Sequence, residues 1–140
     1  MASISRFIEA QEGYPSYEQA LSEIQNGQKR SHWIWYIFPQ IRGLGFSSYA
    51  TYYGIESLDE ARDYLSDAVL GARLREITAA VISRREDNIV IIMGSGIDAM
   101  KFHSSMTLFD LVSPNEVFHE ALVTFFDGAR DEATLRILGL

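Results

Sequence analysis

The chain has 140 residues, of which 47% are hydrophobic and 22% are charged, and this balance is typical of one globular domain rather than of a disordered chain. It contains no cysteine, which excludes a disulfide framework, a cysteine nucleophile and a thiolate metal site. Its formal net charge of −7 argues against nucleic-acid binding, because such binding depends on Lys and Arg contacts to phosphates.

No targeting or membrane-spanning segment is expected. The first eleven residues carry Arg6 and Glu9 and lack the apolar core of a signal peptide. The longest unbroken apolar run, residues 33–38, is far shorter than the roughly 20 residues of a spanning helix. We therefore expect a cytoplasmic protein.

The beginning of the chain predicts two helices separated by glycine. The first is expected over residues 5–11. The second follows Ser16, which can cap it, with Gln19 in the position of a capping box. Gly27 is a suitable end for this second helix.

The aromatic segment, residues 33–38, is apolar on every side, so periodicity cannot decide its structure. Its aromatic residues favour a strand, whereas the helical patterns on both sides favour a buried helix. We predict a helix that Ser31 can cap and that Pro39 ends.

The middle of the chain predicts three further helical segments, at residues 48–53, 58–65 and 68–83. Ser57, followed three residues later by Glu60, is a capping box for the second of these segments. Asp67 can cap the third segment, which is the longest of the three.

Residues 88–93 (Asn-Ile-Val-Ile-Ile-Met) are the best strand candidate in the chain on propensity alone. A strand here would have no partner unless the aromatic segment supplied one. We predict a helix, with a strand as the alternative.

The last third of the chain predicts three helices. One covers residues 98–112, after the break at Gly94-Ser95-Gly96. The next should be started by Ser113-Pro114-Asn115-Glu116, with Pro114 at its first position, and should reach residue 126. Asp131 should cap the last, which ends near residue 138. The fold class predicted is all-α, a compact multihelical single domain over residues 1–140 with about eight helices.

No metal site and no cofactor are expected. The three histidines are His32, His103 and His119, and none of them lies at a metal-ligand spacing from another. The acidic residues gather at predicted helix starts, where the helix dipole favours them.

The glycine loop Gly94-Ser95-Gly96 loosely resembles a phosphate cradle, because it precedes a helix. It matches no established phosphate-binding pattern, and a tight turn between helices is the favoured interpretation. Lys101 lies close enough to this helix start to complete an anion site.

The polar beginning of the aromatic segment is the first candidate site. A histidine at a helix start tends to be neutral, so His32 is the candidate for proton transfer or for stacking on a base. A structural histidine bonded to a carbonyl is an equally good interpretation. Ser31, Trp33 and Tyr36 are the candidate ligand-binding residues beside it, whereas the core should take Ile34, Trp35 and Ile37.

The second candidate site is the segment 101–106 (Lys-Phe-His-Ser-Ser-Met). Two adjacent serines are poor helix formers, so packing or a ligand should account for them. Lys101, His103 and Ser105 are the candidate contacts to the anionic and hydroxyl groups of a ligand. No Ser-His-acid triad is indicated, because the nucleophile-elbow motif is absent.

Two long stretches resemble a bacterial domain-of-unknown-function family, the one numbered eighteen-ten. They are residues 29–40 (Lys-Arg-Ser-His-Trp-Ile-Trp-Tyr-Ile-Phe-Pro-Gln), followed by Gly43-Leu44-Gly45, and residues 101–109 (Lys-Phe-His-Ser-Ser-Met-Thr-Leu-Phe). Shorter matches occur at residues 53–61, 69–74 and 134–135, so the resemblance spans nearly the whole chain. Residues 88–93 depart from the family pattern.

The resemblance implies a compact multihelical fold of the kind seen in a mycobacterial member, and it implies no particular activity. Members often carry the label calpastatin. The sequence gives no reason to expect a calpain inhibitor, which would be disordered and repetitive.

Two classes of function follow, and both are kept open. In the first, the His32-Trp33 and 101–106 motifs face one pocket that binds or processes a small nucleotide-like or sugar-phosphate ligand. A loose likeness of these motifs to an N-glycosidase family that acts on ADP-ribose-type compounds is an analogy only. In the second, the chain is a non-catalytic helical protein-interaction module. This second hypothesis predicts that His32, Trp33, Lys101 and Ser105 are buried and have their hydrogen-bonding groups paired with one another. It also predicts an exposed apolar patch elsewhere on the surface.

Overall fold

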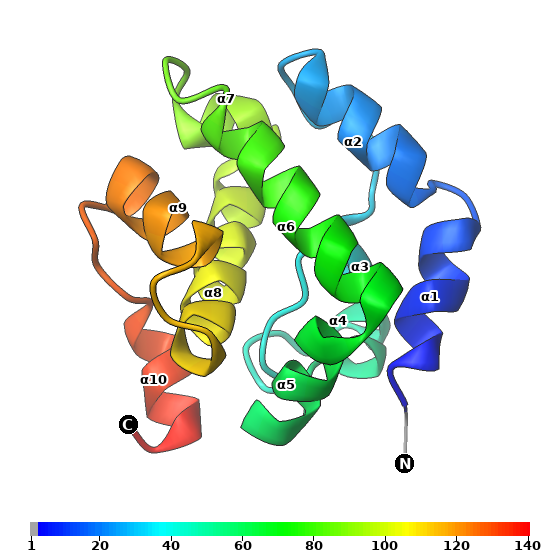
Figure 1. Ribbon diagram of the computed structural model, residues 1–140, viewed down its shortest axis with the longest axis vertical. Coiled ribbons are helices and arrows are strands. Elements are labelled where there is room, and N and C mark those ends of the chain that lie inside the picture. Colours follow the sequence, from blue (N-terminus) through cyan, green and yellow to red (C-terminus); the bar gives the residue numbers. More distant parts are fainter. Residues whose placement is uncertain (1–2) are drawn as a thin grey trace.

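Ten helices form the secondary structure of residues 3–140, the part of the chain that the computed structural model describes (Figure 1). They are α1 (Ser5–Glu12), α2 (Tyr17–Gln25), α3 (Ile34–Ile37), α4 (Ser48–Tyr52), α5 (Leu58–Ser66), α6 (Ala68–Ile82), α7 (Ile89–Met93), α8 (Gly96–Val112), α9 (Val117–Phe126) and α10 (Glu132–Leu138). The predicted all-helical class is confirmed. The described residues form ten helices rather than the expected number of about eight, and the short segments α3, α4 and α7 are among them.

The two longest helices, α6 and α8, form the centre of the fold. Helix α6 packs against α2, α5 and α9, and α8 packs against α5, α7, α9 and α10. In Figure 1, α1 and α2 lie on one side of this centre, and α9 and α10 lie on the other. Within residues 3–140, no helix is long and apolar enough to span a membrane.

Four of the helix starts predicted from short-range capping patterns are confirmed. The side chains of Ser16, Ser57, Asp67 and Asp131 each accept a hydrogen bond from a backbone N–H in the first turn of the following helix. Each cap satisfies a donor that the helix itself leaves free. The cap predicted at Ser31 is wrong, because α3 begins only at Ile34 and the Ser31 hydroxyl donates to Glu23 instead.

The helix predicted for residues 88–93 is confirmed as α7, and the strand alternative is not adopted. Asn88 Oδ1 accepts a hydrogen bond of 2.8 Å from Val90 N and starts α7, which Gly94 ends with a φ of 85°. The capping asparagine and the glycine outweigh the strand propensity of the residues between them.

The predicted start of α9 is wrong. Ser113 lies directly after α8, and α9 begins only at Val117 with no side-chain cap. The reason is tertiary. The carboxylate of Glu116 pairs with Arg75 Nε of α6 at 2.7 Å and also accepts the Ser113 hydroxyl, so neither side chain serves a helix start.

The chain between α3 and α5 is held by a short parallel bridge. Arg42 N donates to Ile55 O at 2.8 Å, and Ile55 N donates to Gln40 O at 2.9 Å. The buried guanidinium of Arg6 donates to Tyr52 O and Gly54 O and pairs with Glu60. These bonds fix the backbone at Gln40, which lines the candidate site described next.

Candidate functional site

The aromatic segment buries one tryptophan and leaves the other at the surface of a cavity. Trp33 is fully buried and its indole N–H donates to Glu23 Oε1 at 2.9 Å. Trp35 is only half-buried. The predicted burial of the two tryptophans is therefore reversed, because α3 is so short that Trp33 precedes it at the N-cap position and packs in the core.

Glu23 holds the loop that leads into α3. Its carboxylate accepts the backbone N–H groups of Arg30 and Ser31 at 2.8 and 3.0 Å, and the Ser31 hydroxyl at 2.6 Å. Burial by itself would raise the pKa of this carboxyl, but the hydrogen bonds from Ser31, the Arg30 N–H and Trp33 outweigh it and lower the pKa to about 2. The hydroxyl of Ser31, a predicted ligand contact, is thus engaged within the loop.

A chain of charges connects this loop to α8. The buried Lys29 Nζ lies 2.7 Å from Asp98 Oδ2, and it also donates to Ser31 O at 2.6 Å. The other Asp98 oxygen lies 3.9 Å from Lys101 Nζ. The Asp98 carboxylate therefore pairs closely with Lys29 and only loosely with Lys101. The N–H groups of the Lys101 ammonium stay available for hydrogen bonds to another partner.

Lys101 is also placed by an aromatic ring. Its Nζ lies 5.0 Å from the centroid of the Trp35 ring, a cation–π contact. Two stretches that are far apart in sequence thus meet, through Trp35 and Lys101 rather than through Trp33 and Ser105.

The Lys101 pocket is a cavity of about 220 Å³. It is lined by Gln40, Leu44, Gly45, Ile97, Met100, Lys101, Ser104, Asp131 and Ala133. Most of this wall is apolar, and its polar groups are Lys101, the Gln40 amide, Ser104 and Asp131. Apolar walls with a few convergent polar groups are typical of small-molecule sites.

Asp131 enters the Lys101 pocket from the start of α10. One of its oxygens accepts the hydroxyls of Ser104 at 2.9 Å and of Thr134 at 2.6 Å, as well as the Thr134 N–H. These bonds fix the carboxylate, so the lining of the cavity contains an ordered negative group as well as the positive group of Lys101.

The aromatic pocket is a second cavity, of about 200 Å³. It is lined by Ala10, Gly13, Tyr14, Pro15, His32, Trp35, Tyr36, Tyr49 and Tyr53. His32 is exposed here, and Tyr36 is buried with its hydroxyl donating to Pro15 O at 2.5 Å. Burial, together with the neighbouring Tyr53 and Tyr49, raises the pKa of Tyr36 to about 12, so this hydroxyl remains a donor.

His32 and Lys101 line different cavities, and Trp35 lies at the boundary between the two. Two other predicted residues, His103 and Ser105, line neither cavity. His103 Nε2 lies 2.8 Å from Ala129 O, and its ring stacks on Phe126 at 3.9 Å. Ser105 is fully buried, and its hydroxyl has no hydrogen-bond partner within residues 3–140.

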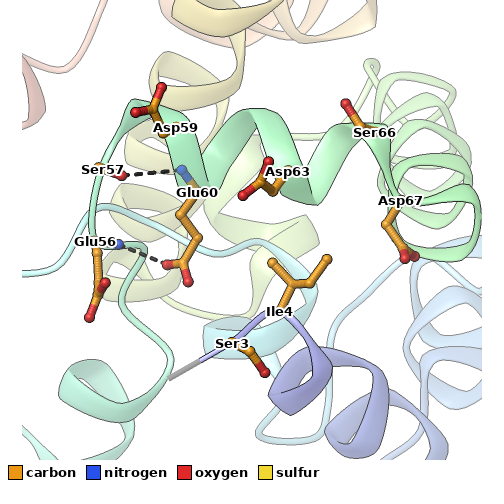
Figure 2. Close-up of a pocket in the computed structure, with 9 residues that line it drawn as sticks. All are labelled: Ser3, Ile4, Glu56, Ser57, Asp59, Glu60, Asp63, Ser66 and Asp67. Atoms are coloured by element: carbon orange, nitrogen blue, oxygen red, sulfur yellow. Dashed lines mark hydrogen bonds between the residues drawn. The ribbon is translucent and has the colours of Figure 1, made fainter. Parts of the chain in front are cut away.

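A broad depression of about 630 Å³ lies beside α5 and is lined mainly by acidic residues (Figure 2). Figure 2 shows Glu60 turned back to accept the Glu56 N–H at 2.9 Å, which is a local helix-start arrangement. Among residues 3–140, no group of three or more His, Asp or Glu side chains is arranged to hold a metal ion.

Sequence reasoning missed Gln40, Ser104 and Asp131, and it missed the half-buried position of Trp35 at the aromatic pocket. One signal was available: Ile97, Met100, Lys101 and Ser104 follow the spacing of a single helix face, which selects Ser104 rather than Ser105. Nothing in the sequence joins Gln40 or Asp131 to that face.

The comparisons with known proteins agree with this fold and add no activity. The family described as "Protein of unknown function (DUF1810)" matches residues 1–138. The chain is similar to a solved structure, the conserved hypothetical protein Rv1873 from Mycobacterium tuberculosis, with 40% sequence identity and a TM-score of 0.91 over 98% of this chain and 96% of that chain. No curated protein matches the sequence.

Proposed function

The chain belongs to the DUF1810 family of proteins of unknown function, as its motifs predicted, and we propose that it binds a small sugar-phosphate or nucleotide-like ligand in the Lys101 pocket. The main observation behind this proposal is that two segments distant in sequence line one cavity. Both long stretches of the family resemblance supply residues to the same cavity, Gln40, Leu44 and Gly45 from one stretch and Lys101 and Ser104 from the other.

The chemistry of the lining supports a phosphate-bearing ligand. The Lys101 ammonium is held by Trp35 and Asp98, yet it makes no hydrogen bond within residues 3–140, so it can donate to an anionic oxygen. Asp131 can accept a hydrogen bond from a ligand hydroxyl, and the Gln40 amide can donate or accept one.

The size of the cavity limits what it can hold. Its volume of about 220 Å³ is below the roughly 300–1,000 Å³ of pockets that enclose drug-sized ligands. A single sugar-phosphate moiety therefore suits the Lys101 pocket better than a complete dinucleotide does.

The alternative, a non-catalytic interaction module, receives less support. Of the four residues that it expects to be buried, Trp33 and Ser105 are buried, but His32 is exposed and Lys101 is partly exposed. An acid–base role for His32 stays a prediction, because His32 lines the aromatic pocket and not the Lys101 pocket.

Calorimetric titration with ribose 5-phosphate tests the proposal. We expect saturable binding by the wild-type chain and a loss of affinity of about tenfold or more in Lys101→Ala, because a hydrogen bond to a charged group contributes roughly 1.5–3 kcal/mol. Arg85→Ala removes an exposed positive charge outside the pocket and is the matched control.

The control should bind ribose 5-phosphate as the wild type does. The proposal fails if the wild type shows no binding, or if the two variants lose affinity equally, since the second result would indicate only a general charge effect.

A further inference from the structure

We infer that the aromatic pocket holds the planar ring of the same ligand, so that the compound bound across both cavities belongs to the nucleoside monophosphates. This inference rests on the proposed function, because it takes the Lys101 pocket as the phosphate end.

The aromatic pocket gathers exposed rings from separate parts of the chain. Tyr14 comes from the connection between α1 and α2, His32 precedes α3, and Tyr49 belongs to α4. Tyr14 and Tyr49 are 86% and 57% exposed. Single exposed aromatic residues are ordinary, but several around one cavity offer ring surface that a flat ligand can cover.

The wall behind these exposed rings is fixed before any ligand arrives. The Tyr36 hydroxyl donates to Pro15 O, and the Tyr36 and Tyr53 rings lie 5.4 Å apart. The Trp35 and Tyr49 rings lie 5.0 Å apart. A preformed aromatic wall lowers the entropy cost of stacking a ligand ring on it.

The charges favour a neutral ring over a cationic group. Trp35 already makes a cation–π contact with Lys101, and none of the residues lining the aromatic pocket carries a carboxylate. A bound cation would therefore lack a counter-charge and would lie near an existing positive group.

The two cavities take part of their lining from the same two segments. Residues 32–40 give His32 and Trp35 to the aromatic pocket and Gln40 to the Lys101 pocket. Residues 44–53 likewise contribute to both. The Trp35–Lys101 contact joins the two walls, so we assign the ring of the ligand to the Trp35 side of this contact and its sugar phosphate to the Lys101 side.

The volumes agree with a ligand that has two parts. Each cavity alone, at about 220 and 200 Å³, is smaller than a pocket that encloses a whole ligand, whereas a compound spanning both falls within the usual range of roughly 300–1,000 Å³.

Calorimetric titration with ribose 5-phosphate, adenosine and adenosine 5′-monophosphate tests the inference. Wild-type protein should bind the monophosphate at least tenfold more tightly than ribose 5-phosphate, which corresponds to about 1.4 kcal/mol. Tyr49→Ala should abolish this gain and leave ribose 5-phosphate binding unchanged. Tyr49→Phe should retain the gain, because it keeps the ring.

Tyr52→Ala is the matched control, since Tyr52 is a half-exposed tyrosine of the same helix that does not line the aromatic pocket. The Tyr52→Ala variant should still bind the monophosphate at least tenfold more tightly than ribose 5-phosphate. Circular dichroism of each variant checks that α4 and the core are intact. Equal wild-type affinity for the monophosphate and ribose 5-phosphate overturns the inference, and so does an equal loss of the gain in Tyr49→Ala and Tyr52→Ala.

The same titrations separate the two proposals. If ribose 5-phosphate does not bind and adenosine binds in a Tyr49-dependent manner, the proposed function fails and the spanning nucleoside monophosphate fails with it, and only a separate ring-binding site is left. If ribose 5-phosphate binds in a Lys101-dependent manner without any gain from the base, the proposed function stands and the ring site fails. If none of the three probes binds, both are overturned.

Discussion

Glu23 shows how one side chain determines the geometry of the whole aromatic segment. Its carboxylate accepts hydrogen bonds from Arg30 N, Ser31 N and Trp33 Nε1. The same group therefore fixes both the backbone of the loop and the position of the buried Trp33 indole. Lys29, which pairs with Asp98 of α8, lies in the same loop. Glu23 thus acts on the site through the position of other residues.

Replacing Glu23 should destabilise the protein in a pH-dependent way. Glu23→Ala leaves the buried Trp33 N–H without a partner, and we expect a loss of about 2–3 kcal/mol at pH 7, measured by urea unfolding. The folded-state pKa of about 2 lies below the usual 4.5, so this carboxylate stabilises the fold fully above pH 4.5 and progressively less as the pH falls toward 2.

The difference between wild type and Glu23→Ala should therefore shrink between pH 5 and pH 2. Glu18→Ala, an exposed change on the same helix, should cost little and show no such trend. A difference that stays constant over this pH range would contradict the hydrogen-bonded carboxylate.

The two tryptophans illustrate how adjacent residues of one kind can differ in role. In the core, the ring centroids of Trp33 and Phe38 lie 6.2 Å apart, and Lys29 Nζ lies 5.0 Å from the centroid of the Trp33 ring. Trp35 faces Tyr49 and Lys101. Both tryptophans lie in the same apolar run, residues 33–38, so residue type alone could not predict which of them is buried in the core.

At the scale of elements, the corner between α5 and α6 depends on close backbone contact. Only Asp67 separates the two helices, and a Cβ added at Gly71 would lie 2.2 Å from Leu65 O of α5. Glycine is therefore required inside α6 for packing, although it is normally unfavourable within a helix.

Gly71→Ala should destabilise the protein by about 1–3 kcal/mol, because the backbone of the corner must shift to remove the overlap. Gly96→Ala, at the first residue of α8, meets no atom within 4 Å and should instead stabilise it by about 0.5 kcal/mol. Thermal and urea unfolding of the two variants provide the comparison. Equal effects of the same sign would show that helix propensity, not contact, decides both positions.

At the scale of the molecule, nearly all helices contribute to one hydrophobic cluster. Phe7 of α1, Ile24 of α2, Leu74 of α6, Phe109 of α8 and Phe118 of α9 are all fully buried within it. Because the helices share this core, the unfolding of one helix exposes apolar side chains of the others to water.

The chain should therefore unfold as one domain. Helix content by circular dichroism and tryptophan fluorescence should follow the same urea transition, although Trp33 reports the core and Trp35 the edge of the aromatic pocket. Two separated transitions would indicate that the chain divides into independent units, and would contradict the predicted single domain.

The predictable features of the fold are those with short-range causes. The caps at Ser16, Ser57 and Asp67 were predicted because each side chain bonds to a backbone N–H only two or three residues away. The start of α9 was not predictable, because Glu116 pairs with Arg75, 41 residues earlier in the chain.

The same distinction holds for the candidate site. Lys101 stands out by residue type, because α8 contains no other Lys or Arg, and it was predicted. Its cavity partners Gln40 and Asp131 lie 61 and 30 residues from it in sequence, and no local pattern connects them. Trp33 and Ser105 were assigned to the site because their neighbours were, whereas packing directs both of them into the core.

The sequence by itself determined the all-helical class, the capped helix starts and the family, because helix periodicity, capping and motifs are local properties of the chain. Only the tertiary structure decided which tryptophan is buried, where α9 begins and which cavity Lys101 lines. These depend on contacts between distant segments, whose side chains compete for the same partners and the same core volume.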